Sequence, residues 1–294
     1  AVINDTRSPS ILRKAAFQLP FFLLAGMVEV NSAMAATETL ELISPWQVER
    51  HAESCALSAA FGNQRNPLVL HFERFEPYHD FQLLMVGKQL KRLVPPTKLS
   101  IAYGSTGKVQ TTASYRQARN ADGTPAILVP VAGLPHDGES TQAVAAGEAA
   151  VDHLTLTIGQ KRQVIVNTGS LGEPFAAFTT CTDQLVSSWG YEPGHKQSLS
   201  RRLSPLSNPS SWLRPADYPG AALFSRAQGM VNFRLDVDAA GTPLRCKVQR
   251  SFGDEFDSTT CSRLMERARF RPALNAAGQP VASYYVNRAY FLIP

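Results

Sequence analysis

Short apolar runs, many with polar residues at alternate positions, fill the first part of the chain after residue 45. Alternation with a period of two predicts strands with one buried face. We expect such strands at residues 67–75, 81–86, 98–103, 126–131, 153–158 and 162–166. Because Gly, Pro and Asn break them into short pieces, a sandwich or barrel-like fold is favoured. The polar, Ala- and Gly-rich stretch 135–147 is expected to be a loop.

The spacing of apolar positions becomes helical after residue 172. Pro174 lies near the start, and the inward positions are Phe175, Phe178, Cys181, Leu185 and Trp189. This spacing predicts a helix over 173–189 that closes the β-rich region, with Cys181 on its inward face.

The N-terminus has the pattern of a signal peptide. Arg13 and Lys14 precede an apolar run over 15–28, and Ala33-Met34-Ala35 provides small residues for cleavage after Ala35. The alternative is an uncleaved membrane anchor, but a spanning helix needs roughly 20 apolar residues and this run has about 14, broken by Pro20. The pattern therefore favours export, with residues 1–35 removed.

Four cysteines in an exported chain favour two disulfides over free thiols. Four cysteines allow three pairings. Cys55 lies near the first strand of the β-rich region and Cys181 on the closing helix. A Cys55–Cys181 bond would join the two.

The remainder of the chain predicts a linker and a second domain. Residues 191–217 are rich in Pro, Ser and charge without a period. After them we expect an α-β-β-α-β order: a short helix over 219–224, a strand over 229–237, a return strand over 244–248, a helix from Asp254 ending before Pro272, and a last strand over 281–292. Leu244, Cys246 and Val248 are expected on the inward face of the return strand. The expected domains are thus 36–190 and 218–294, and the fold class is α+β.

Several motifs in 218–294 occur in an order that resembles the C-terminal domain of TonB-type energy transducers. They are Tyr218-Pro219, the Asp238-Ala-Ala-Gly241 turn, Ser251-Phe-Gly253, and Arg269-Phe-Arg-Pro272-Ala273. The resemblance implies a small periplasmic α+β domain that pairs a strand edge with an extended peptide, the TonB box, of an outer-membrane receptor. With Cys246 and Cys261, the segment resembles a variant of this domain in which a disulfide joins the strand to the helix.

The last strand is the element that the resemblance implies for partner binding. Its candidate residues are Tyr284, Tyr285, Val286, Asn287, Arg288, Tyr290 and Phe291. Tyr284, Val286 and Tyr290 are expected to pack on the helix, which leaves Tyr285, Asn287 and Phe291 on the other face. The same edge would also allow a homodimer.

The chain departs from a full transducer in two respects. The apolar segment 15–28 has no Ser or His to couple to a proton channel, and a β-rich region stands where a transducer has a long Pro-rich spacer. The favoured function is therefore that of a periplasmic, non-enzymatic TonB-like binding protein linked to TonB-dependent transport. The alternatives are a full transducer anchored by residues 11–35 and an envelope enzyme or ligand-binding domain within 46–190.

Charge and motifs add little chemistry to this picture. The positive charges are scattered along the chain, and the net charge of +5 is too small to indicate binding to nucleic acid. The stretch 164–170 is similar to the loop of aspartic proteases, but Asn167 cannot titrate as that mechanism requires. His71 and His79 flank acidic residues (Glu73, Glu76 and Asp80) without the spacing of a metal site, so a surface loop is favoured. No cofactor motif is found, and none is expected.

Overall fold

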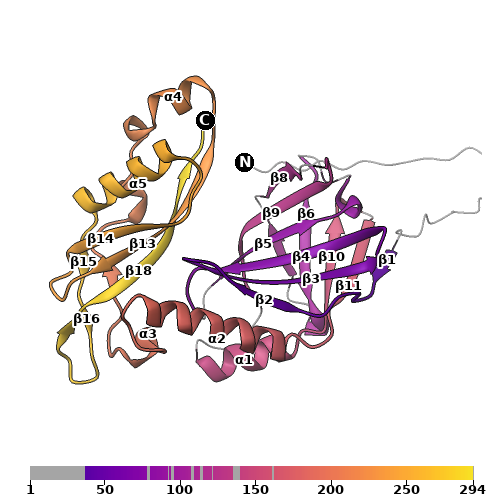
Figure 1. Cartoon of the computed structure of the whole chain (residues 1–294), viewed down its shortest axis with the longest axis horizontal. Coiled ribbons are helices and arrows are strands. Elements are labelled where there is room, and N and C mark those ends of the chain that lie inside the picture. The colour runs from indigo at the N-terminus through magenta and orange to yellow at the C-terminus, as the bar shows by residue number, and fades with distance from the viewer. Residues whose placement is uncertain are drawn as a thin grey trace, which may run out of the picture. The chain divides into compact units, whose positions relative to one another are not determined.

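The computed structural model describes residues 37–77, 80–91, 93, 96–106, 109–112, 115–120, 122–134, 140–160 and 162–293 (Figure 1). The predicted signal peptide, residues 1–35, lies outside this part of the chain. Among the described residues, no helix has both the length and the apolar character needed to cross a bilayer.

Two open sheets form the β-rich region. One is antiparallel and has the order β2-β3-β4-β5-β9-β8, with β2 (Gln47–Arg50), β3 (Cys55–Asn63), β4 (Asn66–Arg74), β5 (Phe81–Val86), β8 (Arg116–Arg119) and β9 (Pro125–Ala132). The other has the order β1-β11-β10-β6-β7, with β1 (Thr37–Leu40), β6 (Leu99–Tyr103), β7 (Val109–Thr112), β10 (His153–Ile158) and β11 (Arg162–Asn167). Short 3-10 turns occupy Lys88–Leu90 and Gly104–Thr106. The expected sandwich-like β-rich fold is confirmed, and its described strands do not close a barrel.

Both sheets contribute to one core. Leu57 and Phe72 of the first sheet and Ile101 and Leu156 of the second are fully buried in the same cluster. The sequence pattern did not predict β1, β2, β3, β7 or β8. In β3, small Ala, Ser and Gly residues at many positions conceal the alternation.

The structure corrects the loop expected over 135–147. Residues 141–149 form helix α1 (Thr141–Ala149), and the Ser140 side chain accepts a hydrogen bond from the Ala143 N–H at its start. Glu148 of this helix is buried and lies 2.8 Å from Arg74 of β4. The loop prediction was wrong over 141–147 because this tertiary ion pair, which is not visible in the local composition, anchors the helix.

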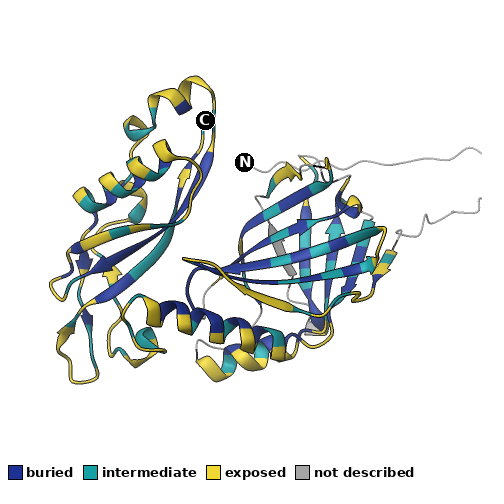
Figure 2. Ribbon diagram, viewed as in Figure 1, coloured by how far each residue is buried: buried dark blue, intermediate teal, exposed yellow. Residues whose placement is uncertain are grey.

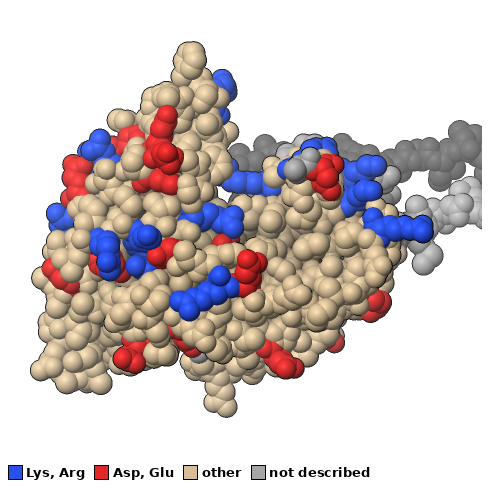
Figure 3. Space-filling model, in the orientation of Figure 1, with Lys and Arg blue, Asp and Glu red and all other residues tan. Residues whose placement is uncertain are grey.

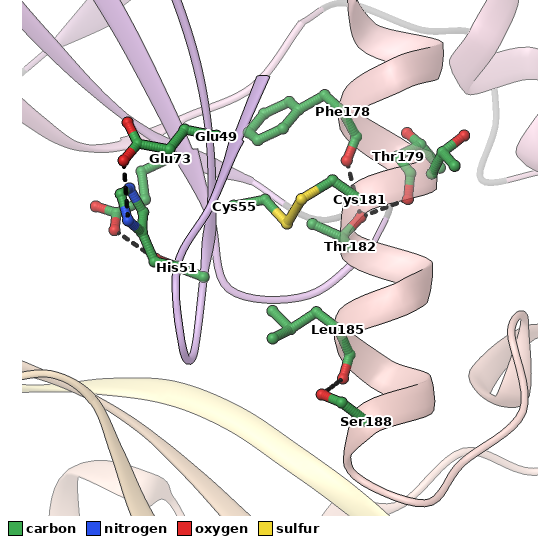
Figure 4. Close-up of a disulfide and its surroundings, with 12 residues drawn as sticks. Glu49, His51, Cys55, Glu73, Phe178, Thr179, Cys181, Thr182, Leu185 and Ser188 are labelled. Atoms are coloured by element: carbon green, nitrogen blue, oxygen red, sulfur yellow. Dashed lines mark hydrogen bonds and ion pairs between the residues drawn. A yellow bond between two sulfur atoms is a disulfide. The ribbon is translucent and has the colours of Figure 1, made fainter. Parts of the chain in front are cut away.

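Helix α2 (Gly172–Ser188) closes the β-rich region as expected. One side of it is buried and the other exposed (Figure 2). Cys181 on the buried side is bonded to Cys55 at the start of β3, with their Cα atoms 6.2 Å apart (Figure 4). The disulfide thus joins the closing helix to the first sheet, in the pairing expected from the sequence.

The C-terminal module contains α4 (Gly220–Phe224), β13 (Gly229–Val237), β14 (Pro243–Arg250), α5 (Asp254–Arg267) and β18 (Ser283–Phe291). Its sheet has the order β14-β13-β18. Phe256 and Leu264 of α5 pack with Val231 and Leu235 of β13 in a second core. A second disulfide joins Cys246 of β14 to Cys261 of α5. The α-β-β-α-β order is confirmed.

Leu244 does not face the core as expected. Asp236 pairs with Arg245 and Val237 with Pro243, so a β-bulge leaves Leu244 between two pairs. Its side chain is 65% exposed. The expectation was wrong for this residue because the bulge interrupts the alternation that still holds for Cys246 and Val248, both of which pack against the core.

Residues 191–217, expected to be a linker, contain short elements that pack against the C-terminal module. These are α3 (His195–Ser198), β12 (Ser204–Pro205) and the 3-10 turns Pro209–Ser211 and Pro215–Asp217. β12 pairs with β15 (Phe270–Arg271), next to the small hairpin of β16 (Ala273–Leu274) and β17 (Pro280–Val281). Trp212 is buried against Phe270 and Tyr285, with ring centroids 5.5 and 5.8 Å away.

Candidate functional site

β18 is an edge strand of the C-terminal sheet. It pairs with β13 in nine consecutive antiparallel pairs, from Gly229 with Phe291 to Val237 with Ser283, without a bulge. No other described strand pairs with it. An edge strand presents unpaired backbone groups that another chain can use.

The other edge of the sheet, β14, has features that discourage such pairing. It begins at Pro243, carries the exposed basic residues Arg245, Lys247 and Arg250, and pairs with β13 with two register shifts. Proline, exposed charge and bulges are the usual protections of an edge strand. β18 contains no Pro and no Lys, so the sheet has one protected edge and one regular edge.

The direction of the backbone groups on β18 follows from one hydrogen bond. The Arg288 N–H donates to its neighbour's side chain, Asn287 Oδ1, at 2.8 Å rather than to β13. Alternate residues of an antiparallel strand direct their backbone groups to the same side. The N–H groups of Val286 and Tyr290 therefore also point to the open edge.

The two faces of β18 are the reverse of those expected. Tyr285, Ala289 and Phe291 pack in the core beside α5, whereas Tyr284 faces the opposite side. Tyr290, expected on the helix, is 42% exposed. The expected faces were wrong because Tyr residues occupy both, and a period of two does not tell which of them faces the helix.

Tyr284 is buried against other aromatic residues of the same chain. It is 3% exposed, and its ring centroid lies 5.3 Å from that of Trp189 and 5.1 Å from that of Tyr191. Lys196 Nζ lies 4.4 Å from the ring centre. Burial raises the pKa of Tyr284 and, together with nearby Asp236, raises the pKa of Tyr191 to about 12. Both phenols are therefore neutral near pH 7.

The N-terminal end of β18 is covered by the segment before α3. Tyr191 Oη donates to the Ser283 carbonyl at 3.0 Å, and His195 Nε2 lies 3.0 Å from Ser283 Oγ. Burial and the charge of Lys196 lower the pKa of His195, which is half-buried. The open part of the edge thus extends from Tyr285 to Tyr290.

A groove of about 420 Å³ lies along this open part. Five candidate residues line one side: Tyr285, Val286, Asn287, Arg288 and Tyr290. Asn232 of β13 and four residues of the β-rich region complete it: Phe75, Glu76, Asp80 and Val131. Of the seven candidate residues, Tyr284 and Phe291 are not in the groove lining and are buried elsewhere.

The sequence pattern did not indicate the part of the site that comes from the β-rich region. All nine residues of β13 are buried, because its outer face contacts that region. Asn232 Oδ1 accepts a hydrogen bond from Gln82 Nε2 of β5 at 3.2 Å, and Arg288 Nη1 donates to the Pro130 carbonyl of β9 at 2.8 Å. The polar Asn232, Arg234 and Asp236 at alternate positions of a strand were the one signal for this second interface.

The acidic residues near His71 form no metal centre in the part of the chain that is described, where no group of three potential ligands gathers. His71 Nδ1 lies 2.8 Å from a β3 hydroxyl, and burial lowers its pKa. Glu73 pairs with Arg250, Glu76 pairs with Lys196, and Asp80 lies in the groove. His79 is outside the described residues.

Basic and acidic side chains are interspersed on the face drawn in Figure 3.

Comparison with known families identifies the C-terminal module. Residues 214–293 match the family model described as the Gram-negative bacterial TonB protein C-terminal, so the resemblance is confirmed. Domains of this family are non-enzymatic and interact with other envelope proteins such as receptors. The β-rich region is not recognised by a family model. No curated protein and no solved structure matches the chain.

Proposed function

We propose that this chain, which has a TonB C-terminal domain at residues 214–293, is a periplasmic protein that binds an extended segment of an envelope partner at the open edge of β18. The partner's backbone would extend the β14-β13-β18 sheet by one strand, and side chains in the groove would select its sequence. An outer-membrane receptor with an extended periplasmic peptide is the partner that the family favours, and TonB-dependent transport is the process.

The difference between the two edges of the sheet carries this proposal. β14 is protected by Pro243, basic side chains and bulges, whereas β18 is regular and borders a groove. A protein that avoided pairing altogether would be expected to protect both edges.

The proposed role is binding rather than energy coupling or catalysis. Residues 191–217 pack against the C-terminal module through Trp212 and β12, so we assign them no role as a long periplasmic spacer. Export itself is tested by N-terminal sequencing of the protein recovered from the periplasm. A start at Ala36 supports it, and an intact segment 11–35 in the membrane fraction supports the anchored alternative.

Strand addition is tested by selecting peptides from a displayed library of random decapeptides with the full chain. Val286→Pro removes an N–H that points to the open edge and is not used by β13, so the sheet should be retained. We expect selected peptides to bind the Val286→Pro variant at least tenfold more weakly. The matched control, Val286→Ala, keeps the N–H and should bind nearly as the parent chain does.

Equal binding by the proline variant would overturn the proposal. Far-ultraviolet circular dichroism and the melting temperature establish that both variants are folded, so that lost binding is not confused with lost structure.

A further inference from the structure

We infer that the β-rich region is a second wall of the partner groove and selects, through Asp80, an extended peptide with a basic side chain. This inference rests on the proposed strand addition at β18, and it gives the β-rich region a role in recognition. The groove residues that come from the β-rich region, Asp80 among them, lie far in sequence from the TonB C-terminal domain.

The groove is built from two parts of the chain. Val286, Arg288 and Tyr290 of β18 form one side. Phe75 and Asp80, from the segment between β4 and β5, and Val131 of β9 contribute to the other. A peptide added to β18 would therefore present side chains to apolar and acidic groups of the β-rich region as well as to the sheet.

Three charged side chains line the groove, Glu76, Asp80 and Arg288, and their charges are unequally compensated. Arg288 donates from Nη1 to the Pro130 carbonyl at 2.8 Å. Glu76 is buried and forms an ion pair with Lys196, so its charge is already neutralised. Asp80 is exposed and forms neither an ion pair nor a hydrogen bond with another described residue. An exposed carboxylate without a partner in the groove lining favours a cationic group on the ligand. A Lys or Arg side chain of the bound peptide is the complementary group.

A buried donor in the groove lining also indicates a ligand. Asn232 is 1% exposed, and its Nδ2 has no hydrogen-bond partner among the described residues. On the other side of this amide, Asn232 Oδ1 accepts from Gln82 Nε2, which also contacts Met230 Sδ at 3.8 Å. A buried donor without an acceptor is destabilising. An acceptor on the bound peptide would satisfy it.

The open edge also sets the length of the ligand. Tyr191 and His195 cover Ser283, so the accessible stretch runs from Tyr285 to Tyr290. At about 3.4 Å per residue, this stretch accommodates an extended segment of about six residues, or roughly 20 Å.

The test repeats the decapeptide selection with the full chain and with the Asp80→Lys variant. We expect the peptides selected by the parent chain to share a Lys or Arg at one position. The Asp80→Lys variant should bind them at least tenfold more weakly and should select Asp or Glu at that position. Glu49→Lys is the matched control, because Glu49 is an exposed carboxylate on β2 that does not line the groove.

The possible outcomes distinguish a failure of the role of Asp80 from a failure of strand addition at β18. Peptides that need the Val286 N–H but show no basic position, or that bind Asp80→Lys unchanged, would overturn the role of Asp80 and leave strand addition intact. A library without any peptide sensitive to Val286→Pro would overturn strand addition, and the inference with it. If sedimentation instead shows a dimer that Val286→Pro disperses, the edge binds a second copy of the chain and both proposals are wrong.

Discussion

Arg234 Nη1 lies 2.8 Å from Glu53 Oε2, and this ion pair joins the central strand of the TonB C-terminal domain to the turn before β3. The Arg234 guanidinium also lies 4.1 Å from the ring centre of Trp189 and bonds Asp236 through Nε at 3.0 Å. These contacts bury the polar face of β13. A face that the domain's own helix leaves uncovered is thus covered by the β-rich region.

Arg234→Ala is expected to destabilise the chain by about 3–5 kcal/mol, because it leaves Glu53 without its buried partner and Asp236 with the exposed Arg245 alone. The free energy of unfolding in urea measures this. The comparison is Glu38→Gln, which removes a more exposed pair with Arg162, at 3.1 Å, and should cost at most about 1 kcal/mol. Equal effects of the two substitutions would show that the β13 interface contributes little to the free energy of unfolding.

Loss of either disulfide should destabilise the chain, and by different amounts. Cys246 and Cys261 are separated by 15 residues, Cys55 and Cys181 by 126. In the chain-entropy model these loops correspond to about 3 and about 5 kcal/mol. Denaturation of the two double Cys→Ala variants tests the order. Alkylation of any cysteine before reduction would contradict the pairing itself.

Gly241 is expected to tolerate substitution far less than Gly278, although both have positive φ (88° and 74°). A Cβ on Gly241 would lie 2.0 Å from the Phe270 carbonyl oxygen, whereas a Cβ on Gly278 would meet nothing within 4 Å. Gly278→Ala should cost about 1–2 kcal/mol for its backbone conformation alone. Gly241→Ala should cost clearly more, because backbone must also move. If Gly241→Ala lowers the melting temperature no more than Gly278→Ala does, this expectation is refuted.

Asp217 links stability to pH. Hydrogen bonds from Arg267, together with the charge of Arg263, lower the pKa of Asp217 to about 2. A carboxyl group with a pKa below its unfolded value of about 3.9 stabilises the fold above that value. The contribution is lost as pH falls from about 4 to 2. The stability difference between the parent chain and Asp217→Asn should be constant from pH 7 to 5 and then shrink. A difference that persists unchanged at pH 2 would exclude this role.

The local pattern of apolar residues was sufficient to predict elements that bury one face. It predicted the α-β-β-α-β order, the closing helix α2 and the inward positions of Cys181 and Cys246. In each case the apolar spacing alone determines which side is buried.

It was insufficient where burial depends on contacts between distant segments. α1 is anchored by a buried pair between Glu148 and Arg74, and the small residues of β3 conceal its alternation. Tyr284 and Tyr285 are equally suited to either face of β18. The wall containing Asp80 exists only because β5 and β9 lie against β13 and β18.

Strand addition at β18 is the central claim, and an N-methyl scan of the tightest selected peptide tests it most directly. Each peptide N–H is methylated in turn, and binding to the full chain is measured by isothermal titration calorimetry. Because only every second N–H of an added strand would bond to β18, binding should be lost at alternate positions over about six residues. Losses without this alternation, or no loss at any position, would contradict backbone pairing at this edge.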